Sequence, residues 1–404
     1  SAASDVYKRQ LITQYYKPEM GAPQNRLYEM CSELKKLGAD ISIITGMPNY
    51  PTGKVFNEYK GKFSTIEVLD DIEIKRYWLY ASNTKKVFPR IWNMISFSMT
   101  VFCALHYLRK RKNDFIIVES PPLTLGATAL ILSKLTGAKL VMNISDLWPL
   151  SARELGVING DSFIYKVLEW LEHHLYKNAV FCMGQSQEIV DYIAKHGAKE
   201  VYLFRNGVDP RRFSCNDIQK TNTDNAPLKI VYAGLLGFAQ GIGEVCKNVN
   251  FKEAKAEFHI YGAGGEQQQI IDYIATHPDC NIYYHGKVDS DEIPMILRQA
   301  DCTLVPLVRN IFGAVPSKIY ESMAAGLPIL FSGDGEGMRI VKENNLGWVS
   351  PALDYKLLEI NIKSMTIDRK DWATKKSNCI DCAKNKFNRP KQVEALYDYM
   401  LKKI

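Results

Sequence analysis

The run from Val315 to Leu330 holds the residues with the clearest potential for chemistry. Its sequence, VPSKIYESMAAGLPIL, predicts a helix that follows Pro316, with Ser317 as N-cap, and that ends before a new buried strand. Free backbone N–H groups at a helix start, beside Lys318, suit phosphate oxygens, and Glu321, about one turn later, can accept hydrogen bonds from two sugar hydroxyls. The alternative is a capped amphipathic helix with an exposed glutamate.

Three glycine-containing loops also follow predicted strands. Two lie in the same half of the chain as Glu321: residues 232–241, with Gly234 and Gly237, and residues 261–266, with Gly262 and Gly264. The second lacks the third glycine of a dinucleotide-binding fingerprint. Glycine lets the backbone approach a ligand closely, and tight packing of strand against helix is the alternative use of the same residues. The third loop contains Gly21 and follows the first strand of the chain.

Two carboxylates stand where predicted strands of the first half end. Asp146 follows the strand Lys139–Ile144, where it either contributes a polar group to a functional site or caps the next turn. Glu119 follows the strand Phe115–Val118, where it either binds an acceptor or terminates the strand.

The histidines and cysteines do not predict a metal site. His173 and His174 are neighbours in a helical pattern and lack the i, i+4 spacing of metal ligands, so a surface or interdomain contact is expected. Cys379 and Cys382 form a lone C-x-x-C without a second pair and are expected to be unliganded helix residues.

Short β-branched runs alternate with amphipathic stretches along the chain, which predicts two doubly wound α/β units in series. The expected strands are Leu11–Gln14, Ile41–Thr45, Phe115–Val118, Lys139–Ile144 and Val180–Cys182, then Lys229–Ala233, Glu257–Tyr261, Asn281–His285, Cys302–Pro306 and Pro328–Ser332. A polar linker, 216–226, separates the two sets. The expected domains are 11–210 and 227–385, with residues 1–10 as a non-native leader and 386–404 as a helix that could cross back to the first domain.

The composition is that of a globular protein and excludes a disordered, collagen-like or coiled-coil chain. The chain has 404 residues, of which 46% are hydrophobic and 24% charged, with a formal net charge of +7. That charge is too mild for a nucleic-acid binder but favours an anionic partner, either membrane lipid or a phosphorylated substrate. Nine scattered cysteines, an odd number, indicate a reducing cytosol.

The segment 87–112 is the most apolar part of the chain and ends in Arg109, Lys110, Arg111 and Lys112. It is a poor membrane span because Arg90, Asn93 and His106 interrupt it. Two interpretations carry equal weight. One is a helix lying in the membrane interface, and the other is a buried crossover helix with basic residues in its last turn.

Several of these motifs together resemble the retaining nucleotide-sugar glycosyltransferases of family 4. The resemblance covers nearly the whole chain, and residues 47–54 (MPNYPTGK) and 145–149 (SDLWP) are similar to the bacterial polysaccharide subgroup that includes L-fucosamine (N-acetyl-fucosamine) transferases. It is also carried by residues 15–21 (YYKPEMG), 205–209 (RNGVD) and the segment around Glu321.

The resemblance implies the GT-B fold, with two Rossmann-like domains facing across a cleft, and metal-independent transfer of a sugar from a UDP-sugar donor. It implies catalytic roles for Asp146, Lys318 and Glu321, with Glu321 on the ribose hydroxyls and Lys318 on the diphosphate. The implied donor-binding set is Gly21, Gly234, Gly237, Gln240, Gly262, Gly264, Arg309, Pro316, Ser317, Lys318, Ile319 and Glu321.

The chain departs from the family pattern in three places. The family usually has two glutamates separated by seven residues, and Gly313 stands at the position of the first, eight positions before Glu321. Phe238 and Gln240 stand where relatives often supply cations, so more of the diphosphate charge would fall on Lys318 and Arg309. The histidine that many relatives carry after the fourth strand has no counterpart at residues 144–146.

The resulting expectation is a cytoplasmic enzyme, peripheral on the inner face of the membrane through 87–112. It would transfer an N-acetylated (6-deoxy)hexosamine to a lipid diphosphate-linked saccharide during surface polysaccharide (O-antigen or capsule) biosynthesis. A nucleotide-sugar epimerase of the same fold and a non-catalytic nucleotide-sugar-binding protein are the alternatives.

Overall fold

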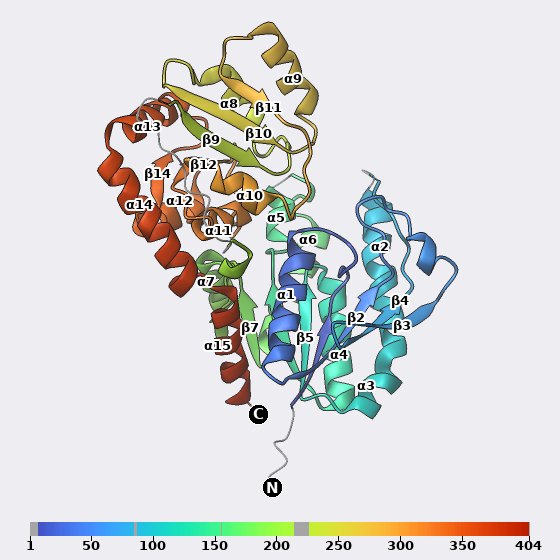
Figure 1. Cartoon of the computed structure of the whole chain (residues 1–404). Coiled ribbons are helices and arrows are strands. Elements are labelled where there is room, and N and C mark those ends of the chain that lie inside the picture. The colour runs from blue at the N-terminus through green and yellow to red at the C-terminus, as the bar shows by residue number, and fades with distance from the viewer. Residues whose placement is uncertain (1–6, 85–86, 155, 214–225, 404) are drawn as a thin grey trace. The chain divides into compact units, whose positions relative to one another are not determined.

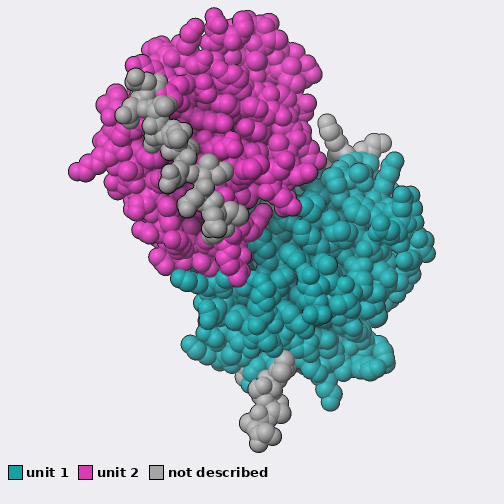
Figure 2. Space-filling view, in the orientation of Figure 1, with its two compact units in different colours: residues 1–205, 390–404 teal, residues 206–389 magenta. Residues whose placement is uncertain are grey.

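The computed structural model describes residues 7–84, 87–154, 156–213 and 226–403 (Figure 1). The chain divides into two compact units, shown in Figure 2: unit 1 is residues 1–205 and 390–404, and unit 2 is residues 206–389. Each unit is described by itself.

Unit 1 is built on an eight-stranded sheet with the order β3-β4-β2-β1-β5-β6-β7-β8, in which only the β3–β4 pair is antiparallel. The central strands are buried along their whole length, because helices cover both faces of the sheet. The strands are β1 (Lys8–Ile12), β2 (Asp40–Gly46), β3 (Ser64–Leu69), β4 (Ile72–Tyr77), β5 (Phe115–Ser120), β6 (Lys139–Ile144), β7 (Phe181–Gly184) and β8 (Val201–Leu203).

The helices of unit 1 are α1 (Ala22–Lys36), α2 (Val87–Thr100), α3 (Leu105–Arg111), α4 (Leu123–Thr136), α5 (Leu150–Glu154), α6 (Phe163–Asn178) and α7 (Gln187–Lys195), with short 3₁₀ turns at Asn57–Tyr59 and Val101–Ala104. Helix α1 buries Leu27, Met30 and Leu34, the residues that its amphipathic pattern places on one face. The last helix, α15 (Arg389–Leu401), buries Val393, Leu396 and Met400 in the same core cluster.

Unit 2 is built on a fully parallel six-stranded sheet with the order β11-β10-β9-β12-β13-β14. Its strands are β9 (Leu228–Ala233), β10 (Ala256–Tyr261), β11 (Ile282–Tyr284), β12 (Cys302–Pro306), β13 (Ile329–Ser332) and β14 (Gly347–Ser350). Its helices are α8 (Ile242–Asn248), α9 (Gln267–Thr276), α10 (Ile293–Arg298), α11 (Ser317–Ala324), α12 (Gly335–Glu343), α13 (Tyr355–Ile367) and α14 (Arg369–Asp381), with a 3₁₀ turn at Pro210–Phe213 and a π-helical turn at Cys382–Lys386.

The predicted fold class is confirmed, since both units are doubly wound α/β sheets. All ten predicted strands are present, but the first begins at Lys8, so residues 8–10 belong to the sheet and the exclusion of 1–10 from the fold was wrong there. Four strands were not predicted: β3, β4, β8 and β14. The predicted linker, 216–226, lies outside the described residues except for its last position.

The apolar segment 87–112 forms the crossover between β4 and β5. Its inward side is fully buried at Phe97, Val101, Ala104 and Leu108, which matches the interpretation as a packed crossover helix. Residues 88–111 are also long and apolar enough to cross a membrane by length and composition. An 18-residue stretch of this segment has a mean hydropathy of 1.3, but 39% of that stretch is buried inside the structure. Packing in the unit thus accounts for one side of the segment, and its outer side remains apolar.

Candidate functional site

The central strands of unit 2, β9 and β12, lie side by side, and the chain leaves them in opposite directions across the sheet. Residues of α8 and α9 join one core cluster and residues of α11 and α12 join another, so the helices that follow β9 and β12 cover opposite faces. In open α/β sheets such a reversal of strand order leaves a crevice at the carboxyl ends of the strands, where ligands bind. The predicted donor residues of unit 2 follow β9, β12 and the neighbouring strand β10.

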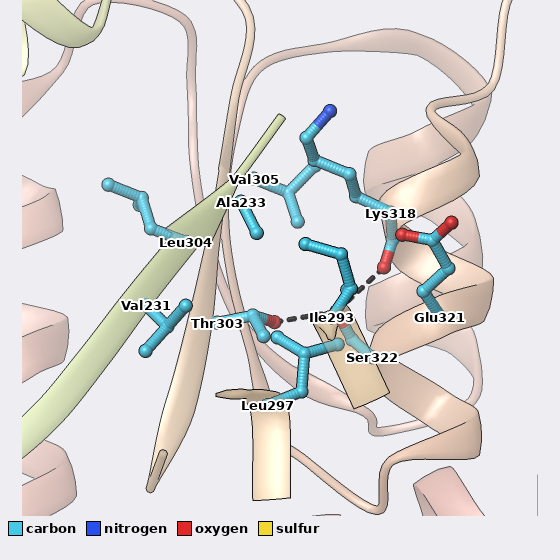
Figure 3. Close-up of a pocket in the computed structure, with 10 residues that line it drawn as sticks. All are labelled: Val231, Ala233, Ile293, Leu297, Thr303, Leu304, Val305, Lys318, Glu321 and Ser322. Carbon is cyan, nitrogen blue, oxygen red and sulfur yellow. Dashed lines mark hydrogen bonds between the residues drawn. The ribbon is translucent and has the colours of Figure 1, made fainter. Parts of the chain in front are cut away.

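Helix α11 carries Lys318 and Glu321 on one side, beside a small pocket (Figure 3). Ser322 of α11 and residues of β9, α10 and β12 complete the pocket: Val231, Ala233, Ile293, Leu297, Thr303, Leu304 and Val305. Pro316 is the N-cap residue and no side chain caps the helix, so the prediction of Ser317 as N-cap was wrong. Ser317 and Ile319 occupy the first turn, and Ile319 is fully buried. The helix start therefore presents backbone N–H groups without a side-chain acceptor of its own.

Lys318 lies directly against the first glycine loop. A Cβ atom on Gly234 would come within 2.5 Å of both Cε and Nζ of Lys318, so a larger residue at position 234 would displace the end of the Lys318 side chain. The Lys318 Nζ atom is 5.2 Å from the ring centroid of Tyr232. Burial lowers the pKa of Lys318, and the nearby Glu321 carboxylate partly opposes that shift. An anionic ligand at Lys318 would remove the cost of this desolvated cation.

The second glycine loop, residues 261–266, packs directly against the first. A Cβ atom on Gly262 would lie 1.8 Å from the Gly234 carbonyl oxygen, and one on Gly264 would lie 2.3 Å from that of Leu236. Backbone hydrogen bonds join the loops, from the Gly234 N–H to the Tyr261 carbonyl (2.9 Å) and from the Leu236 N–H to the Ala263 carbonyl (3.0 Å). Packing between the loops therefore accounts for glycine at 262 and 264.

The remaining predicted donor-binding residues lie in loops of the same unit. Within the first glycine loop, the Gln240 Oε1 atom is buried without a hydrogen-bond partner in the described part of the chain, and a Cβ atom on Gly237 would lie 2.9 Å from it. Phe238 is 74% exposed. Arg309 is exposed in the loop after β12, and Gly313, in the same loop, has a φ angle of +80°.

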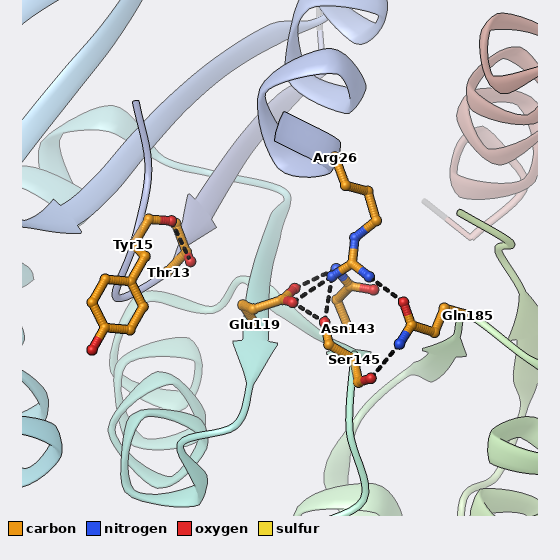
Figure 4. Close-up of polar contacts among 7 residues, drawn as sticks. All are labelled: Thr13, Tyr15, Arg26, Glu119, Asn143, Ser145 and Gln185. Carbon is orange, nitrogen blue, oxygen red and sulfur yellow. Dashed lines mark hydrogen bonds and ion pairs between the residues drawn. The ribbon is translucent and has the colours of Figure 1, made fainter. Parts of the chain in front are cut away.

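Unit 1 has a polar cluster at its own point of strand reversal, between β1 and β5 (Figure 4). Glu119, the penultimate residue of β5, forms a 2.5 Å ion pair with Arg26 of α1, and both side chains are less than a tenth exposed. Glu119 also accepts hydrogen bonds from Asn143 and Ser145, and Arg26 donates one to Gln185.

The Glu119 carboxylate is consequently saturated by its own unit. Burial raises the pKa of Glu119, while Arg26 and the two hydrogen-bond donors oppose that shift. Of the two roles expected for this residue, the geometry matches a structural one at the end of the strand. The sequence did not indicate Arg26, which lies 93 positions earlier and belongs to another element.

Asp146 lies in the loop between β6 and α5, partly buried. The Ser151 hydroxyl donates a hydrogen bond to its Oδ2 atom (3.2 Å), and burial raises the pKa of the carboxyl group. These contacts hold Asp146 against the first turn of the short helix α5.

Gly21 precedes α1 in an extended conformation. A Cβ atom there would lie 2.4 Å from the Gln24 Oε1 atom, so glycine at 21 makes room for that carboxamide. Gly21 and Gln24 both line a pocket of unit 1 with a volume of about 320 Å³.

The histidines and cysteines form no group of three potential metal ligands within the described residues. His173 stacks on His196 and His174 stacks on Trp170, all in unit 1. Cys379 is buried in α14 and donates hydrogen bonds to the carbonyls of Leu327 and Leu346. Cys382 begins the π-helical turn that follows.

The two sheets, each with its reversal point and its helices on both faces, define the GT-B class. Residues 21–207 match the family description "Glycosyl transferase 4-like domain", and residues 214–386 match "Glycosyl transferases group 1". These two matches together account for most of the chain, which belongs to the group 1 glycosyltransferases.

The individual relatives have low sequence identity to this chain. The chain is 26% identical over 263 residues to "Probable glycosyltransferase WbjE" of Pseudomonas aeruginosa, an alignment that covers 61% of this chain and 64% of that protein. It is 25% identical over 326 residues to WcaI of Escherichia coli (strain K12), which is named for colanic acid biosynthesis, covering 77% of this chain and 79% of that protein. The crystal structure of Anabaena Alr3699/HepE in complex with UDP has the same fold, with a TM-score of 0.71 and 14% identity over 98% of this chain and all of that one.

Proposed function

We propose that this glycosyltransferase transfers a sugar from a UDP-sugar to a saccharide acceptor during surface polysaccharide biosynthesis, with retention of the anomeric configuration. One observation carries the proposal. In a chain of this family, Lys318 and Glu321 lie together on α11 beside the pocket at the reversal point of unit 2, and Lys318 packs directly on Gly234. The UDP held by the related fold and the names of the curated relatives support this choice of donor and pathway.

In this proposal Glu321 accepts hydrogen bonds from the ribose hydroxyls and Lys318 holds the diphosphate. Negative charge develops on the diphosphate as the bond from the sugar C1 atom to its oxygen breaks. Lys318 and the backbone N–H groups at the start of α11 stabilise that charge, with Gly234, Gly237 and Arg309 close to the diphosphate. Because protein groups supply the positive charge, we expect transfer without a metal ion.

The donor sugar and the acceptor follow from the sequence resemblance. We propose an N-acetylated (6-deoxy)hexosamine as the donor sugar and a lipid diphosphate-linked saccharide as the acceptor. Asp146 is proposed to contact the donor sugar. The exposed apolar side of the segment 87–112, with its basic end, is proposed to place the enzyme on the inner face of the cytoplasmic membrane.

The experiment combines calorimetric titration of UDP and GDP with an assay of UDP release from a panel of UDP-hexoses and UDP-N-acetylhexosamines, with and without EDTA. We expect UDP to bind more tightly than GDP and one donor to release UDP slowly by hydrolysis, unaffected by EDTA. Adding a lipid extract that contains the acceptor should accelerate release.

Three outcomes would change the assignment. Failure of UDP and all donors to bind would contradict the proposed site. Binding without turnover on any acceptor would favour a nucleotide-sugar-binding protein, an alternative that Gly313 keeps open in place of the family's second glutamate. Conversion of the donor to its epimer without acceptor would favour the epimerase.

A further inference from the structure

A pocket of about 320 Å³ lies within unit 1, separate from the Glu119 cluster. It is formed by the loop between β1 and α1, the first turn of α1, the loops that follow β2 and β4, and the first turns of α2. Its lining consists of Tyr15, Gly21, Pro23, Gln24, Tyr50, Ser82, Asn83, Arg90, Asn93 and Met94. The volume is at the lower end of the range for small-molecule sites and suits about one sugar residue with a charged substituent.

The pocket is positively charged. Arg90 is its one charged lining residue, and its guanidinium forms no hydrogen bond or ion pair with any residue in the described ranges. Glu19, a carboxylate that acts electrostatically on Tyr15 of the pocket, is buried and already accepts hydrogen bonds from the backbone N–H groups of Tyr16, Asn49 and Tyr50. Arg90 is therefore available for an anionic ligand, and a guanidinium matches a phosphate group with two parallel hydrogen bonds.

The rest of the lining suits a sugar. The rings of Tyr15 and Tyr50 meet edge to face with centroids 6.2 Å apart and offer aromatic surface for the apolar face of a pyranose. The Gln24 side chain is buried, and the space that its Oε1 atom occupies exists because residue 21 has no Cβ. The Ser82 hydroxyl is buried without a hydrogen-bond partner in the described part of the chain. Buried polar groups of this kind are satisfied when ligand hydroxyls replace water.

Apolar surface begins next to the charge. Phe88, Ile91 and Trp92 stand in the same two turns of α2 as Arg90 and are 78%, 45% and 42% exposed. An anion bound at Arg90 would thus sit between a sugar-sized pocket and an exposed apolar helix face. The structure thus places a sugar-sized pocket, a site for phosphate and an apolar surface one after another. A saccharide that is linked to a lipid through phosphate has its parts in the same order.

We infer that this pocket binds a sugar phosphate: Arg90 pairs with the phosphate that joins the saccharide acceptor to its lipid, Gln24, Ser82 and Tyr50 contact the sugar, and Phe88, Ile91 and Trp92 face the lipid. The inference rests on the proposed transfer to a lipid-linked acceptor and adds the group by which that acceptor is recognised. It makes Arg90 a determinant of specificity for phosphorylated acceptors.

The test uses the full-length protein and ligand-observed NMR with N-acetylglucosamine 1-phosphate, free N-acetylglucosamine and glucuronic acid as probes. We expect the sugar phosphate to bind about tenfold or more tightly than the free sugar, since a charge-assisted contact is worth at least that factor. Arg90→Gln should abolish this difference. Lys134→Gln, which removes one positive charge from an exposed position of α4, should preserve it.

Three results would overturn the inference: equal affinity for the phosphorylated and free sugars, an unchanged preference in Arg90→Gln, or tighter binding of glucuronic acid, which would assign Arg90 to a sugar carboxylate. UDP titrations of the same proteins separate this inference from the proposed function. UDP should bind wild type and Arg90→Gln equally, because the UDP site is assigned to unit 2. If UDP binds but the sugar phosphate does not, the inference about Arg90 is wrong while the proposed function stands. If UDP does not bind the wild-type protein, the proposed function itself is refuted.

Discussion

Both units are doubly wound sheets, but they use the reversal point of their sheets in opposite ways. In unit 1, buried side chains meet there and satisfy each other, with Arg26 and Glu119 paired at 2.5 Å. In unit 2, two glycine loops meet there, and the Lys318 ammonium group lies beside Gly234 without a hydrogen-bond partner in the described part of the chain. Removing one partner of a buried charged pair destabilises a fold, whereas an unpaired, desolvated cation can bind an anionic ligand. Charged residues at the reversal points of the two sheets therefore differ in role because one set has protein partners for its charges and the other does not.

The largest expected effect comes from breaking the ion pair between Arg26 and Glu119 in unit 1. Arg26→Met leaves the Glu119 carboxylate buried without its cation, and loss of one partner of a buried ion pair costs about 3–5 kcal/mol. Chemical denaturation at pH 7 should show this loss. Lys36→Met, at an exposed position of the same helix, should change stability by about 1 kcal/mol or less. Equal losses in both variants would contradict the structural role of the cluster.

The pH dependence of the stability of Arg26→Met tests whether the Glu119 charge causes the loss of stability. Without the guanidinium, burial should raise the pKa of Glu119 further above its ordinary value of 4.5. A carboxyl group with a raised folded-state pKa contributes stability that is complete below the unfolded pKa and is lost as pH rises through the folded one. The deficit relative to wild type should therefore shrink as pH falls toward about 4.5. A deficit that stays constant from pH 7 to pH 4.5 would show that Glu119 ionisation is not its cause.

The next prediction removes the unpaired cation of unit 2, Lys318. Lys318→Met should reduce the rate constant of donor cleavage by about 100- to 1000-fold, because a group that stabilises developing charge is lost. Thermal stability should be unchanged or higher, since burial lowers the pKa of Lys318 and methionine carries no charge to desolvate. Lys342→Met on α12 is the matched control. Full turnover in Lys318→Met would place the diphosphate elsewhere.

Glu321→Ala comes next. The carboxylate is proposed to accept hydrogen bonds from ribose, and hydrogen bonds to charged groups are worth about 1.5–3 kcal/mol, so UDP affinity should fall about 10- to 100-fold. Calorimetry should detect the change with the melting temperature preserved. Glu343→Ala, exposed at the end of α12, should bind UDP as wild type does, and wild-type affinity in Glu321→Ala would remove Glu321 from the site.

The smallest effect concerns Gly21. Gly21→Ala places a methyl group against the Gln24 carboxamide and should weaken sugar phosphate binding by about twofold to tenfold, the value of one hydrogen bond. UDP affinity serves as the internal control and should not change. A similar fall in UDP affinity would place Gly21 at the nucleotide, the role that the sequence resemblance implied.

Local sequence patterns predicted the buried parallel strands because a run such as Cys302–Pro306 is apolar throughout. They missed β3, whose Ile66 and Val68 are more than half exposed on an antiparallel edge, and β14, which is only four residues long. The segment around Glu321 was found because Lys318 and Glu321 lie in one helix, so their proximity is local. Arg26 with Glu119 and Arg90 with Tyr50 are brought together only by tertiary packing, and no local pattern could pair them.

The most direct test of the contrast between the units is hydrogen exchange measured by mass spectrometry with and without UDP. The account predicts slower exchange in peptides that cover 234–241 and 316–324 of unit 2 when UDP is present. The peptides of β5 and α1 that carry the Glu119–Arg26 pair should already exchange slowly and should not change. Protection confined to unit 1, with 234–241 and 316–324 unaffected at saturating UDP, would contradict the assignment of the nucleotide to unit 2.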